Sequence, residues 1–153
     1  MQLSVKDIKG FKVYNHESDE PWGVVADICF NCDNATVTEL IVETLSIIPI
    51  TKTVKFNEIN NIIKGAVILK ANSMPQIRNK NLNTTDATEH FNRIEYVSDN
   101  QTKKKLWDIR FDFETGELVD LVVAKNFFSR KNHIPANKMY LKDNTIYINS
   151  KEV

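Results

Sequence analysis

Apolar and polar side chains alternate along residues 24–30 (VVADICF) and again along residues 106–111 (LWDIRF). Alternation with a period of two residues predicts a β-strand with one buried face. The large apolar residues expected on that face are Ile28 and Phe30 in the first strand, and Trp107, Ile109 and Phe111 in the second. A polar turn and a second apolar stretch follow each strand, at 37–42 and at 118–123. The pattern therefore predicts two hairpins.

The two predicted hairpins have related sequences. Residues 27–42 (DICFNCDNATVTELIV) and 108–123 (DIRFDFETGELVDLVV) align without a gap, with five identical and five similar pairs. We expect them to fold as equivalent hairpins, because a slip of one residue would turn every core side chain outward. In the second turn Gly116 can adopt a positive φ, and Asn34 is the best substitute in the first turn.

The similarity continues after the hairpins. Residues 54–70 and 134–149 each contain a short strand, a one-turn segment and a closing hairpin. Each unit thus offers five or six strands in about 65 residues, which is enough to close a small barrel. The sequence predicts an all-β protein of two small β-barrels in tandem, related by a pseudo-twofold axis. The expected domains are 1–72 and 90–153, with a polar linker at 73–89.

Short motifs within these units resemble those of a known family. Residues 3–13 read LSVKDIKGFKV, residues 23–28 read GVVADI, residues 114–119 read ETGELV, and Ile134 precedes Pro135. Together they resemble the PRC-barrel family. Its members include the cytoplasmic domain of the photosynthetic reaction centre H subunit and the C-terminal domain of a ribosome maturation factor. The resemblance implies a tandem PRC-barrel protein of bacterial type.

Neither copy carries the whole family pattern. The positions that match are Gly10 and Gly23 in the first copy, and Gly116 and Pro135 in the second. Their counterparts in the other copy are Phe91, Lys104, Ala35 and Lys55. These family positions shape turns and strand ends, so the resemblance implies no catalytic residues.

The resemblance favours a non-enzymatic function, because members of the family are largely assembly and interaction modules. We expect a cytoplasmic adaptor that binds a protein partner, with self-association as a further option. One alternative is an RNA-processing or ribosome-associated assembly factor that acts through a ribosomal protein. Another is a small ligand-binding barrel. Fold-level analogy alone does not separate these functions.

Charge and hydropathy narrow the range of partners. The formal net charge is zero, with 7 basic and 9 acidic residues in 1–72 and 13 and 11 in 73–153. A chain without a basic excess is not expected to bind nucleic acid directly. No apolar segment approaches the ~18 residues needed to span a bilayer. The first ten residues contain no apolar signal core, so we expect a cytoplasmic protein.

Few residues offer catalytic or metal chemistry. Asp27 and Asp108 occupy the same place in different units, so they are not expected to act as a catalytic pair, and each should accept hydrogen bonds from a neighbouring loop. Cys29 and Cys32 lie on opposite faces of the predicted strand and have no second ligand pair. We therefore expect them to bind no metal and to form no disulfide with each other. No cofactor is expected.

The loops between the central and closing hairpins are the candidate binding sites. Their apolar residues are Leu45, Ile47, Ile48 and Ile50 in the first copy and Phe127 and Phe128 in the second. A unit this small cannot bury every apolar side chain, and exposed apolar side chains mark interaction surfaces. Alternatively, these residues cover a barrel end or pack one unit on the other. Trp107 is expected in the core.

Overall fold

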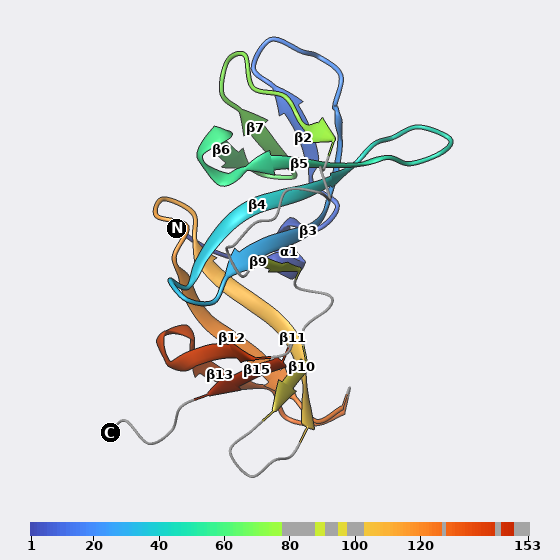
Figure 1. The fold of residues 1–153 in the computed structure, drawn as a ribbon. Coiled ribbons are helices and arrows are strands. Elements are labelled where there is room, and N and C mark those ends of the chain that lie inside the picture. Colours follow the sequence, from blue (N-terminus) through green and yellow to red (C-terminus); the bar gives the residue numbers. More distant parts are fainter. Residues whose placement is uncertain (78–87, 91–94, 98–102, 127, 143–144, 149–153) are drawn as a thin grey trace.

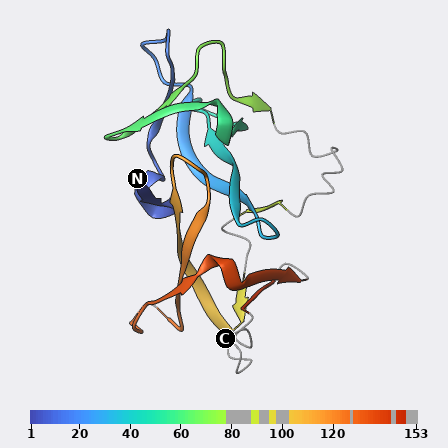
Figure 2. The same cartoon turned by 90° about the vertical axis from the view of Figure 1, so that its left-hand side faces the viewer.

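The computed structural model describes residues 1–77, 88–90, 95–97, 103–126, 128–142 and 145–148. These residues are nearly all β, as the sequence predicted. Figures 1 and 2 show an elongated molecule with one sheet towards each end, and the two central hairpins meet between them.

Short elements make up both sheets. Those of the first part of the chain are β1 (Gln2–Ser4), α1 (Val5–Ile8), β2 (Lys12–Asn15), β3 (Gly23–Asn31), β4 (Thr36–Glu43), β5 (Thr51–Lys55), η1 (Phe56–Glu58), β6 (Ile59–Ile63), β7 (Ala66–Leu69), β8 (Gln76–Ile77) and β9 (Thr88–His90). Those of the second part are β10 (Glu95–Val97), β11 (Lys103–Asp112), β12 (Leu118–Ala124), β13 (Asn132–Pro135), η3 (Ala136–Lys138), β14 (Met139–Lys142) and β15 (Thr145–Ile148).

Six strands of each sheet follow the same order, and in the first sheet β8 is added next to β5. The strand order is β6-β7-β2-β3-β4-β5 in the first sheet and β14-β15-β10-β11-β12-β13 in the second. In each sheet one neighbouring pair is parallel, β2 with β7 and β10 with β15. Neither order returns to its first strand, so within the described residues these are open sheets and not closed barrels.

The central hairpins β3–β4 and β11–β12 have the same register. Val25 pairs with Val42, and 81 positions later Leu106 pairs with Val123. The two irregularities in the β3–β4 pairing also recur at the same positions in β11–β12. The prediction of two equivalent hairpins is confirmed, whereas their place in two separate barrels stays a prediction.

The first irregularity is a β-bulge, which changes the face that one side chain occupies. Trp107 is the extra residue of β11, between the paired residues Leu106 and Asp108. A bulge interrupts the alternation of faces. Ile109 and Phe111 are fully buried, but Trp107 is only partly buried and Leu106 takes the inner position. The expectation that Trp107 belongs to the core is wrong for this reason.

The two hairpin turns contact each other at the centre of the molecule. The amide of Val37 donates to the carbonyl of Gly116, and the amide of Leu118 donates to that of Ala35, both at 2.8 Å. Gly116 has the expected positive φ of 77°, but its counterpart with positive φ is Ala35, at 52°. The expectation that Asn34 would take this conformation is wrong, because Ala35 is the residue that aligns with Gly116.

Each half of the chain adds one strand to the sheet of the other half. The N-terminal β1 pairs with β11, and β9 pairs with β3. One continuous cluster of buried apolar residues runs through both sheets. The predicted linker 73–89 contains β8 and part of β9, and the domain boundaries 1–72 and 90–153 remain a prediction.

Candidate interaction surface

The hairpin β4–β5 ends in an exposed apolar loop, residues 44–50, which we call the apolar loop. Four large aliphatic side chains lie on it. Their exposed fractions are 60% for Leu45, 102% for Ile47, 79% for Ile48 and 49% for Ile50. The loop projects away from the sheets, to the right in Figure 1. The alternative that these side chains cover a barrel end or pack between the units therefore does not hold for this loop.

Hydrogen bonds inside the apolar loop hold its backbone in shape. The amide of Thr44 donates to the carbonyl of Ile50 at 3.0 Å, and the amide of Ile50 donates to Thr44 Oγ1 at 2.8 Å. Thr44 Oγ1 also lies 2.8 Å from Ser46 Oγ, which donates to the carbonyl of Ile48 at 2.7 Å. A loop fixed in this way presents its aliphatic side chains in one arrangement, which lowers the entropy cost of binding.

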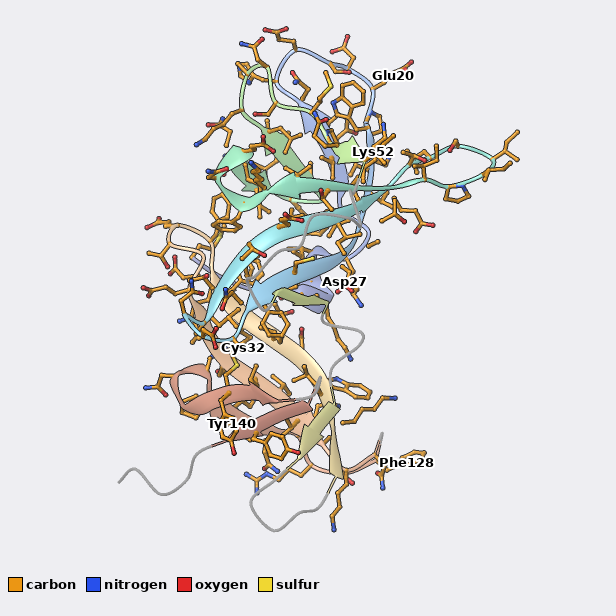
Figure 3. All side chains as sticks on the ribbon, viewed as in Figure 1. Glu20, Asp27, Cys32, Lys52, Phe128 and Tyr140 are labelled. Atoms are coloured by element: carbon orange, nitrogen blue, oxygen red, sulfur yellow. The ribbon has the colours of Figure 1, made fainter. Side chains whose placement is uncertain are left out.

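The corresponding loop of the second half contains Phe128, whose side chain is 94% exposed. It lies away from the ribbon at the lower right of Figure 3. Asn126 shapes this turn, because its Oδ1 accepts hydrogen bonds from the Phe128 amide at 3.0 Å and from Ser129 Oγ at 2.9 Å. Phe127, the other predicted residue, lies outside the described residues.

A cluster of lysines surrounds Trp107, and sequence reasoning missed it. The Lys6 ammonium lies 3.4 Å from the ring centroid, and the Lys131 ammonium lies 4.6 Å from it. Both contacts are cation–π interactions. Burial and repulsion from Lys131, Lys9 and Lys105 lower the pKa of Lys6, while Asp108 opposes this effect.

The repeated aspartates accept hydrogen bonds from backbone amides. Asp27 and Asp108 are both buried, and each accepts a hydrogen bond from the amide of the next residue at 2.8 Å. Asp108 Oδ1 also accepts from the amide of Lys6, at 3.1 Å, and so fixes the first turn of α1 to β11. The predicted hydrogen-bonding role is thus correct for Asp108, but the donor belongs to a helix and not to a loop.

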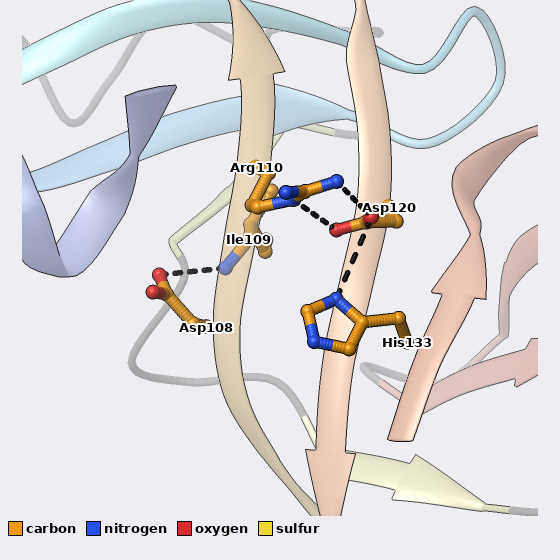
Figure 4. Close-up of polar contacts among 5 residues, drawn as sticks. All are labelled: Asp108, Ile109, Arg110, Asp120 and His133. Carbon is orange, nitrogen blue, oxygen red and sulfur yellow. Dashed lines mark hydrogen bonds and ion pairs between the residues drawn. The ribbon is translucent and has the colours of Figure 1, made fainter. Parts of the chain in front are cut away.

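A charged group on the outer surface of the second sheet has no counterpart in the first (Figure 4). Arg110 donates two hydrogen bonds to Asp120, from Nε at 2.9 Å and from an Nη at 2.6 Å. These bonds and the charge of Asp120 raise the pKa of Arg110. His133 Nδ1 lies 3.6 Å from Asp120 Oδ2. The equivalent residues of the first half, Cys29, Glu39 and Thr53, cannot form such a group.

Cys29 and Cys32 are both buried, and they form no disulfide with each other. Cys29 lies in β3, and Cys32 lies in the turn that follows this strand. Among the described residues no group of three or more His, Cys, Asp or Glu side chains could hold a metal ion. The absence of a bound metal stays a prediction.

Three of the remaining family positions serve backbone geometry. Gly10 has a φ of 86°, and its amide donates to the carbonyl of Val25 at 2.8 Å. A Cβ on Gly23 would lie 2.3 Å from the carbonyl oxygen of Glu43, so no other residue fits there without a shift of the backbone. Pro135 ends β13, the outermost strand of its sheet, where a missing amide is tolerated.

The nearly all-β architecture, with open sheets repeated around a central pair of hairpins, defines the class of fold. Residues 1–73 match the family model of the PRC-barrel domain, in agreement with the resemblance found in the sequence. No curated protein matches the chain. Within the described residues, no helix has the length and apolar character needed to cross a bilayer.

Proposed function

We propose that this protein is a non-enzymatic interaction module that binds a protein partner through the apolar loop. The observation that carries the proposal is the exposure of Leu45, Ile47, Ile48 and Ile50 on one fixed loop. Single exposed aliphatic residues are common on protein surfaces, but a contiguous group marks a site of association. The PRC-barrel match to residues 1–73 supports an interaction function.

The form of the loop favours an apolar groove as the binding partner. The loop contains no charged residue between Glu43 and Lys52, so its insertion buries no unpaired charge. The amides of Thr44 and Ile50 and the carbonyls of Ile48 and Ile50 are already hydrogen-bonded within the loop, so these groups need no new partner on binding. The partner is either another protein or a second copy of the chain.

Two further points belong to the same proposal. The second half is a second PRC-like unit, so that two such units stand in tandem; the shared strand order and register support this. The protein acts in the cytoplasm, and the absence of a disulfide between Cys29 and Cys32 is in keeping with a reducing compartment.

A matched pair of double variants tests the proposal. Ile47→Ser with Ile48→Ser removes the two most exposed side chains of the apolar loop. Ile63→Ser with Ile77→Ser is the control, because these aliphatic residues are 50% and 72% exposed but lie outside the loop. Self-association is measured by sedimentation velocity, and partner binding by quantitative affinity purification from the native cells.

The loop variant is expected to lose self-association or at least one partner that the control retains. Truncation of an apolar anchor typically costs ~2 kcal/mol or more, about a thirtyfold loss of affinity. Both variants should unfold at nearly the same temperature as the natural protein, since exposed positions contribute little to stability. Identical partners and mass for the two variants would contradict the proposal.

A further inference from the structure

We infer that the lysines around Trp107 form a second binding surface, which takes an acidic, extended segment of a protein partner. The lysine cluster comprises Lys6, Lys9, Lys105 and Lys131. It is separate from the apolar loop, so the inference does not depend on the proposed function.

Two of these lysines contact the ring of Trp107 through cation–π interactions. The bulge in β11 places the ring outside the core, with the ammonium groups of Lys6 and Lys131 at 3.4 and 4.6 Å from its centroid. Lys6 belongs to α1, and Lys131 directly precedes β13, so residues from both halves of the chain meet here. The same position of the first hairpin is Ala26, which offers no ring to hold cations.

Among the described residues, the charges that act on Lys6 are mostly positive, although the chain as a whole is neutral. Of the charged groups that influence Lys6, three are lysines and one is a carboxylate, Asp108. Asp108 is buried and accepts hydrogen bonds from the amides of Lys6 and Ile109. It therefore balances only part of the positive charge. Like charges held close together are stabilised by an anionic partner that neutralises them.

The geometry favours carboxylates over a nucleic acid. Binding of a single-stranded nucleic acid uses bases that stack on open aromatic rings. Two ammonium groups lie over the Trp107 ring, so a stacked base would have to displace them. Carboxylates need only approach the ammonium groups from solvent, and Lys105 and Lys131 are both exposed.

A sheet edge beside the cluster can hold the backbone of such a segment. β13 is the outermost strand of its sheet, and no described strand pairs with its outer side. In the first sheet, β8 pairs with the outer side of the equivalent strand β5, antiparallel, at Lys52 and Thr53. The corresponding residues of β13 are Asn132 and His133, next to Lys131. Addition of a strand to a sheet edge is a known mode of peptide recognition.

The test uses a fluorescein-labelled peptide of alternating glutamate and threonine, and binding is measured by fluorescence anisotropy at low salt. The cluster variant is Lys105→Gln with Lys131→Gln. The control is Lys64→Gln with Lys70→Gln, which removes the same charge from exposed positions elsewhere. The cluster variant should bind roughly five- to tenfold more weakly than the control, as expected for the loss of two exposed ion pairs.

Two spectroscopic measurements locate the peptide. Trp107 is the only tryptophan left in a Trp22→Phe variant, so the peptide should change its fluorescence. The backbone amide resonances of Asn132 to Ile134 should also shift on binding. Equal affinity of the cluster and control variants, or unchanged resonances of β13, would overturn the inference. So would tighter binding of oligouridylate, or complete displacement of the peptide by an equal concentration of inorganic phosphate.

Discussion

The two central turns place an alanine and a glycine in the same left-handed conformation. Replacing the alanine by glycine, and the glycine by alanine, should therefore change the stability of the protein in opposite directions. Ala35 has a φ of 52° and Gly116 a φ of 77°. For residues with a Cβ this conformation costs roughly 1–2 kcal/mol, and glycine avoids the cost at the expense of some chain entropy. We expect Ala35→Gly to stabilise the protein by about 0.5–1 kcal/mol.

Gly116→Ala should destabilise the protein by more than Ala35→Gly stabilises it. An added Cβ would lie 2.9 Å from Cε1 of Phe56, so the ring would have to move. Phe56 packs edge-on against Phe111 and Phe113, with centroids 6.3 and 6.2 Å away. Such pairs contribute about 0.5–1.5 kcal/mol each. Partial loss of both, added to the cost of the backbone conformation, gives about 2–3 kcal/mol.

Differential scanning calorimetry can measure both changes. For a chain of this size 1 kcal/mol shifts the melting temperature by roughly 2–4 °C. Ala35→Gly should raise it by about 1–4 °C, and Gly116→Ala should lower it by about 4–12 °C. The core is continuous between the sheets, so one transition is expected. A lower melting temperature for Ala35→Gly, or a drop of less than 2 °C for Gly116→Ala, would refute this account of the turns.

Two further predictions concern carboxylates. Asp108→Asn should cost about 1–2 kcal/mol and speed hydrogen exchange in α1, because the Lys6 amide loses a charged acceptor; unchanged exchange would show that this bond does not hold the helix. Hydrogen bonds from the amides of Thr115 and Glu114 lower the pKa of Asp112 below its usual 3.8. The contribution of Asp112 to the stability of the fold is therefore present above pH 3.8, and it is lost as the pH falls through the lower pKa of the folded state. Asp112→Asn should therefore flatten the acid side of the stability profile measured by urea unfolding, and an unchanged slope there would contradict this.

The repeated alternation of apolar residues was enough to predict the two hairpins, because register and burial depend on the same period. The bulge at Trp107 was not predictable from periodicity, since one extra residue reverses the faces locally. The repeat itself held a signal: the equivalent residue is Ala26, and a shared core position rarely exchanges alanine for tryptophan. The pairing of β1 and β9 with the other half's sheet could not be predicted, because a strand of three residues is too short to show a periodic pattern.

The candidate surface was predictable in part. The apolar loop stood out because consecutive aliphatic residues break the alternation of a strand and follow no helical period. The lysine cluster did not, because Lys6 and Lys131 lie far apart in the sequence and meet only after β1 has joined the second sheet. A zero net charge also conceals a local excess of cations.

The most direct test of the interaction function is site-specific photo-cross-linking of the protein in its native cells. A photoreactive phenylalanine derivative replaces Ile48 in the apolar loop or, as a control, Ile63 on β6. The proposed function predicts a discrete cross-linked product from position 48, either with one partner protein or with a second copy of the chain, and none from position 63. Identical products from both positions, or none from position 48 at normal protein levels, would contradict it.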